Sequence, residues 1–244
     1  MTAPNYYLLA LGVILAALIL MVVRFEGKKP RAREIVLLAV MTALAVAGRT
    51  AFFMLPQFKP LAAVVIITGV TLGAESGFLV GVMSAFVSNF IFGQGPWTPF
   101  QMLAFGLVGL VAGLLFYRRG HAQHSGLVAE AEGGEVVSPA VVSVNDVATT
   151  LAMLARTQRM SFARTLMLSV YGGLSVLVMY GLIVDILYML MFSESASVST
   201  LFAVLVSGLP FNAIHGASTA FFLVVLAPPM TEKLTRIKLK FNLP

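Results

Sequence analysis

The chain has 244 residues, of which 59% are hydrophobic and only 11% charged, with a mean hydropathy of +0.95 and a net charge of +6. This composition excludes a globular protein that is solvated on every side, and it indicates an integral membrane protein. Continuous apolar runs of about 20 residues favour helical spans over the alternating strands of a β-barrel, which need only about 10 residues each. The absence of cysteine excludes disulfides, thiolate metal sites and a cysteine nucleophile.

Hydropathy predicts seven spans, approximately over residues 6–23, 35–53, 61–72, 77–92, 100–116, 166–191 and 200–226. Basic residues follow the first span and none precede it, so we interpret it as a retained helix and not as a cleavable signal peptide. The third span is short and must be tilted, interfacial or extended by its neighbours. A tight turn is expected over residues 73–77, and Pro228 and Pro229 are expected to end the seventh span.

The segment from Asn89 to Gln101 separates two spans and contains two glycines, two prolines and the only tryptophan of the chain. Because glycine frees the backbone and proline fixes it, Gly93 to Pro96 should form a shaped loop. Trp97 is a residue type that favours the water–lipid boundary. The loop is therefore expected at a membrane surface, either as a binding loop or as a turn with one aromatic anchor.

Residues 120–164 form the one sizeable polar segment. His121 and His124 have no further ligands at useful spacing, so we expect no metal site there. Residues 151–160 are interpreted as a short amphipathic helix on the membrane.

Fourteen of the sixteen Lys and Arg residues lie after the first span, around the 120–164 segment or in the tail. By the positive-inside rule, these three regions are cytoplasmic, which places the N-terminus outside and the C-terminus inside a cell membrane. The two exceptions are Arg49 and Lys59. A charge in lipid is costly, so Arg49 must snorkel, pair or face a polar cavity.

Several polar residues then share the outer end of the spans, which suggests a cavity open to the outside, with Asn212 and His215 as its floor. For each residue singly, a satisfied helix–helix hydrogen bond remains the alternative. The candidate substrate-binding residues are Arg49, Phe58, Lys59, Asn89, Gln94, Gly95, Trp97, Thr98, Gln101, Tyr180, Asp185, Asn212 and His215. In this interpretation Phe58, Trp97 and Phe100 stack on a planar ring, and the cations and amides satisfy its polar edge. No catalytic residue, metal or cofactor is expected.

The region from Arg33 to Phe116, and less clearly the last two spans, resembles the substrate-binding S component of prokaryotic energy-coupling factor (ECF) vitamin transporters. The resemblance is carried by four features: an alanine stripe (Ala39, Ala43, Ala47), the stretch from Arg49 to Pro60 that ends Gln-Phe-Lys-Pro, the turn at 73–77, and the segment 89–101. The Gly-Pro-Trp-Thr form of the last segment looks most like the corrinoid (cobalamin-type) branch. Riboflavin or another ring compound also suits the expected site.

The resemblance implies an all-α, six-helix S component, here residues 31–244, that captures a vitamin or precursor outside the cell. It would dock through the alanine stripe on a membrane coupling subunit with two cytoplasmic ATPases; the chain has no phosphate-binding loop of its own. Two features depart from the family pattern: an extra helix with a basic linker over residues 1–30, and a cytoplasmic loop at about 118–165. The other classes considered are an intramembrane enzyme, a self-sufficient secondary transporter and a structural subunit.

Overall fold

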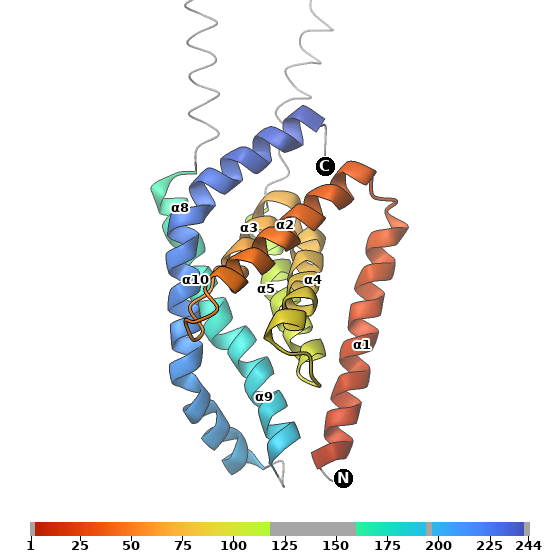
Figure 1. Ribbon diagram of the computed structural model, residues 1–244, viewed down its shortest axis with the longest axis vertical. Coiled ribbons are helices and arrows are strands. Elements are labelled where there is room, and N and C mark those ends of the chain that lie inside the picture. The colour runs from red at the N-terminus through yellow and green to blue at the C-terminus, as the bar shows by residue number, and fades with distance from the viewer. Residues whose placement is uncertain (1–2, 118–159, 194–196, 242–244) are drawn as a thin grey trace, which may run out of the picture.

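The computed structural model describes residues 3–117, 160–193 and 197–241, and within these ranges every regular element is a helix (Figure 1). The helices are α1 (Ala3–Gly27), α2 (Ala32–Ala51), α3 (Leu61–Leu72), α4 (Ala74–Phe92), α5 (Thr98–Phe116), α8 (Phe162–Ser175), the π-helix η1 (Val176–Tyr180), α9 (Gly181–Phe192) and α10 (Val198–Phe241). Since α8, η1 and α9 run on continuously, these elements form a bundle of six helices preceded by α1. The predicted all-α membrane fold is confirmed. The histidine pair and most of the 120–164 segment lie outside the described residues.

Six helices of the described chain are long and apolar enough to cross a membrane, whereas α3 has only 12 residues. The short α3 lies at the centre of the bundle, and every residue from Leu61 to Thr71 is buried. It packs against α2, α4, α5, α8 and α10. A helix that is apolar on all sides belongs in such a core, so its length need not match the bilayer.

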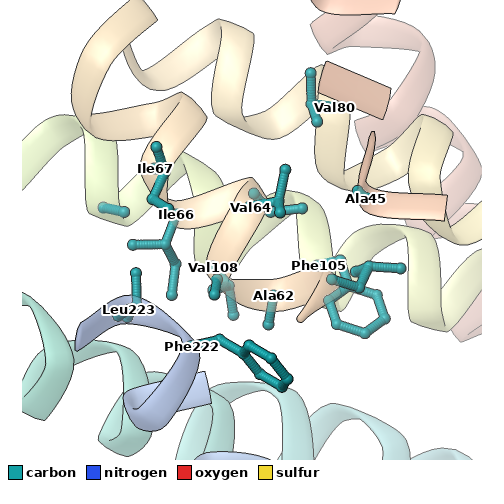
Figure 2. Close-up of a cluster of buried hydrophobic side chains, with 14 of the residues drawn as sticks. Ala45, Ala62, Val64, Ile66, Ile67, Val80, Phe105, Val108, Phe222 and Leu223 are labelled. Carbon is teal, nitrogen blue, oxygen red and sulfur yellow. The ribbon is translucent and has the colours of Figure 1, made fainter. Parts of the chain in front are cut away.

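The main hydrophobic core surrounds α3 (Figure 2). Ile66 and Ile67 of α3 are fully buried, and Val108 of α5 and Leu223 of α10 close the cluster from two sides. Residues from both ends of the chain thus meet on one short helix. This packing holds α2, α4 and α5 in fixed positions next to the C-terminal helices.

The connection between α3 and α4 is shorter than the predicted turn over 73–77. Gly73 alone makes the reversal, with φ of +102°, and α4 begins at Ala74. A left-handed φ is accessible to glycine without steric cost, so one residue suffices where the sequence suggested five. Gly77 lies inside α4 and is buried.

The prediction that Pro228 and Pro229 end the last span is wrong, because α10 continues through them to Phe241. Proline in a helix interior removes a hydrogen bond and favours a bend, and the C-terminal part of α10 leans across the end of the bundle (Figure 1). Tertiary contacts hold this part in place. The Lys238 ammonium donates to the Thr71 carbonyl at 3.1 Å and to the Tyr117 hydroxyl at 3.0 Å.

Two of the three segments predicted to share the cytoplasmic side, the one after α1 and the C-terminal part of α10, lie at one end of the molecule (Figure 1). Lys28, after α1, forms a 2.7 Å ion pair with Glu75 at the start of α4. The Arg33 guanidinium lies 5.3 Å from the ring centre of Phe241 near the chain end. The start of α1, the end of α9 and the start of α10 are at the opposite end, and the α4–α5 loop points toward that end (Figure 1).

Candidate functional site

The last turn of α2 directs Arg49 into the bundle, toward α4. Its guanidinium donates to the Ser88 hydroxyl and, at 3.0 Å, to the Asn89 side-chain oxygen. Ser88 and Asn89 are almost completely buried. Of the alternatives for Arg49, the structure therefore shows a cation held by polar side chains of the neighbouring helix.

Asn89 links this cation to the start of α5. Its amide nitrogen donates to the Thr98 hydroxyl at 3.1 Å and to the Gln101 side-chain oxygen at 2.9 Å. The Thr98 hydroxyl in turn donates to Gln94 at 2.9 Å. Five predicted site residues thus form one continuous network, which also explains the polar residues near the ends of α4 and α5.

The α4–α5 loop folds compactly on itself. Gly93 has a φ of +102°, and its carbonyl accepts a hydrogen bond from the Trp97 indole at 3.3 Å. The indole lies over Gly95, where a Cβ would come within 2.5 Å of the ring. The loop is shaped as expected, and Trp97 is exposed at its tip.

The loop between α2 and α3 brings Lys59 to the same region. Its backbone N–H donates to the Ser218 hydroxyl at 2.9 Å, and Ser218 returns a bond to the Lys59 carbonyl at 3.2 Å. The ammonium lies 4.9 Å from the ring centre of Phe92, and the Arg49 guanidinium lies 4.3 Å from the same centre. Burial and the Arg49 charge lower the pKa of the Lys59 ammonium below its usual value. Phe58 packs against Phe222, with ring centres 5.2 Å apart.

Tyr180 and His215 lie at the inner boundary of this region, and both are buried. Their rings meet edge to face at 4.8 Å, and each also contacts Phe105 of α5. Tyr180 is the last residue of η1, and π-helical turns occur frequently at functional sites. The buried Nδ1 of His215 has no hydrogen-bond partner among the described residues.

Asp185 and Asn212 form a separate pair between α9 and α10. The Asn212 amide donates to an Asp185 carboxylate oxygen at 2.9 Å. Gly208 and Gly181 allow the close approach, since a Cβ on either would come within 2.6–2.7 Å of the pair. These two predicted residues thus make the helix–helix hydrogen bond that was the alternative for each of them, and no hydrogen bond or ion pair joins them to Arg49 or Lys59 among the described residues.

Sequence reasoning missed three contributors. The Ser88 hydroxyl donates to the Ala85 carbonyl of its own helix at 3.2 Å and also accepts from Arg49. Ser218 lies three residues after His215, on the same face of α10, and that spacing could have identified it. Tyr7 of α1 donates to the Pro96 carbonyl at 3.1 Å and stacks on Phe100 at 5.7 Å.

The predicted docking stripe is on the outside of the bundle. Ala39, Ala43 and Ala47 are all exposed on α2, whereas Met41 and Ala45 face the core. In the described part of the chain, no group of three His, Asp or Glu side chains could hold a metal ion.

The fold and the site together define a multi-pass helical membrane protein with a polar, partly cationic site toward one end of its bundle. A family model described as "ECF-type riboflavin transporter, S component" matches residues 29–190, which is more than half of the chain. The chain therefore belongs to this family of transporter components, and the resemblance inferred from the sequence is confirmed at that level. A search of curated proteins and a search of solved structures each found no match. The matched region begins after α1.

Proposed function

We propose that this chain is the substrate-capturing S subunit of an ECF-type importer. The observation that supports this most directly is the buried network from Arg49 through Asn89 to Gln101, with the unpartnered Nδ1 of His215 nearby. Buried polar groups are normally satisfied within the protein, and a group left without a partner is a candidate contact for a ligand. The network and the α4–α5 loop lie at the end opposite the basic segments, which positive-inside reasoning places outside the cell.

The ligand we propose is a ring compound of vitamin type. The form of the α4–α5 loop favours a corrinoid, and the description of the matching family favours riboflavin. In both cases Trp97, exposed at the loop tip, offers an aromatic face, and the amide groups offer hydrogen bonds to the ring edge. A preformed loop lowers the ordering cost of binding and so favours tight capture.

Delivery would rest on partner proteins. The exposed alanines at positions 39, 43 and 47 present a smooth face to which another transmembrane helix can pack closely. We propose that this face docks on a membrane coupling subunit and that two cytoplasmic ATPases supply the energy for release inside.

Binding calorimetry on the purified full chain in detergent tests the capture role, with cobalamin, cobinamide and riboflavin as ligands. We expect nanomolar binding of one compound and a loss of at least about tenfold in Asn89→Ala, since truncation breaks three charge-assisted or buried hydrogen bonds. Thr50→Ala is the matched control, because the hydroxyl next to Arg49 in the sequence bonds, among the described residues, to the Val46 carbonyl of its own helix and not to the network. Equal losses in both variants, or no binding by any of the three compounds to folded protein, would contradict the proposal.

A further inference from the structure

The site contains two positive charges, and neither has a carboxylate partner among the residues that the structure describes. Arg49 and Lys59 converge on one ring, with distances of 4.3 and 4.9 Å to the centre of Phe92. The ion pairs found among the described residues, such as Lys28 with Glu75 and Arg236 with Glu232, do not include either site cation. Two like charges held close together in a partly buried place repel each other and favour an anion between them.

Arg49 points to the interior of the bundle, and the loop that carries Lys59 is anchored to the bundle. Arg49 donates to Ser88 and Asn89, whose exposed fractions are 0% and 1%. The backbone of Lys59 is held on both sides by the buried Ser218 of α10. The Arg49 guanidinium is therefore fixed between α2 and α4, where the network lies, and the Lys59 backbone is fixed against α10.

The sequence supports the same conclusion independently. These two residues are the only Lys and Arg outside the three basic regions assigned to the cytoplasmic side. Cations at the outer end of spans oppose the positive-inside tendency, and an ionisable residue inside a span, such as Arg49, indicates a functional site.

We propose that the transported ligand presents an anionic group, a phosphate or a carboxylate, to Arg49 and Lys59. This inference rests on the proposed function, because it assumes that the site receives a ligand. Arg49 supplies a planar guanidinium that can donate two parallel hydrogen bonds to an oxyanion, and Lys59 adds a point charge. Phe92, in contact with both cations, would hold them in place before the ligand arrives.

Inorganic phosphate tests the inference directly. The full chain in maltoside detergent would carry ¹³C-methyl groups on its lysines, with the Lys59 NMR signal assigned by its loss in Lys59→Arg. We expect phosphate to shift this signal saturably, chloride at equal ionic strength to leave it unchanged, and Arg49→Gln to weaken the phosphate effect at least about tenfold. Arg49→Lys should retain part of it. A Lys59 signal that responds equally to phosphate and chloride would overturn the inference.

A matched pair of ligands extends the test, because riboflavin and riboflavin 5′-phosphate differ only in the anionic group. We expect the phosphorylated compound to bind at least about tenfold more tightly, and Lys59→Gln to abolish the difference. Equal affinity of the two compounds would count against the inference if riboflavin binds.

Two further outcomes separate the inference from the proposed function and from a lipid. If a compound of the calorimetry panel binds and phosphate has no specific effect, the capture role stands and the anion site falls. If phosphate acts but no panel compound binds, the anion site stands and the capture role falls. The short-chain lipid dihexanoylphosphatidylglycerol and glycerol phosphate would be compared by the same Lys59 NMR signal. If the lipid saturates this signal at a concentration about tenfold lower than glycerol phosphate does, the anion is a lipid headgroup and the inference is overturned.

Discussion

Helices α3, α4 and α5 contact one another through glycine backbones, and this contact can be tested with one methyl group. A Cβ added to Gly77 of α4 would lie 2.6 Å from the Gly109 carbonyl oxygen of α5 and 2.6 Å from the Gly69 Cα of α3. Both obstacles are backbone atoms, so no side-chain rotation can relieve the clash. Gly77→Ala must therefore separate the helices.

The size of the effect follows from these distances. Ordinary van der Waals contact begins at 3.4 Å, so the Cβ needs about 0.8 Å more room on two sides at once. Overpacking of this kind lowers the free energy of unfolding by about 1–3 kcal/mol. The better helix propensity of alanine offsets up to about 1 kcal/mol of this loss. At roughly 2–4 °C per kcal/mol for a chain of this size, we expect the melting temperature to fall by several degrees.

The assay is thermal denaturation of purified protein in detergent, followed as the monodisperse fraction after heating. Gly12→Ala is the matched control, because a Cβ at Gly12 of α1 has no atom within 4 Å. It should melt at or slightly above the wild-type temperature, since only helix propensity changes. If the melting temperature of Gly77→Ala equals that of Gly12→Ala, the three helices do not rely on close glycine contact and the reasoning is refuted.

Three further predictions concern the site and its surroundings. Ala43→Trp should abolish co-purification with the co-expressed coupling subunit and ATPases, while the affinity for the ligand is kept. Val13→Trp, at an exposed position of α1, should leave the complex intact. Loss of co-purification in both variants would refute a specific docking face. Lys59→Gln should raise the melting temperature at pH 7, because burial lowers the pKa of the Lys59 ammonium and so disfavours its charged form in the folded state, and the gain should vanish as the pH rises past about 10.5. Arg49→Gln should lower the melting temperature, because it removes the hydrogen bonds to the buried Ser88 and Asn89. The same sign for both variants would contradict the reasoning. Tyr7→Phe removes the hydroxyl that donates to the α4–α5 loop but keeps the ring stacked on Phe100. Hydrogen exchange of the backbone amides in that loop should therefore accelerate while the fold is kept. Unchanged exchange would show that α1 does not hold the loop.

The fold was largely predictable because lipid imposes simple rules. Each span must satisfy its own backbone groups and be apolar over a known length, so hydropathy and the positions of Gly and Pro were sufficient for the bundle. The predicted bounds of the third span, 61–72, agree with α3. Errors occurred where tertiary contacts outweigh local preference, as at Pro228 and Pro229 in α10.

The site was predictable in composition but not in pairing. Costly polar residues near span ends indicated Arg49, Asn89 and Gln101, and the structure joins all three. Nothing in the sequence separated these residues from Asp185, which bonds to Asn212 and, within the described ranges, has no bond to the network. Such pairing depends on helix rotation, which side-chain packing sets and hydropathy does not encode.

The two sides of the site differ in construction, and this difference bears on how a ligand could be held and released. Arg49, Asn89 and Gln101 come from α2, α4 and α5, of which α4 and α5 are joined by the glycine contacts to the buried α3. Tyr180 and His215 come from the π-helical turn and from the long, proline-containing α10. A ligand that bonds to the unpartnered Nδ1 of His215 and to the Arg49 network would bridge these two sides. That bridge would break if the π-turn or the Pro210 region of α10 bent, since these are places where helices bend, while the core around α3 keeps both sides folded.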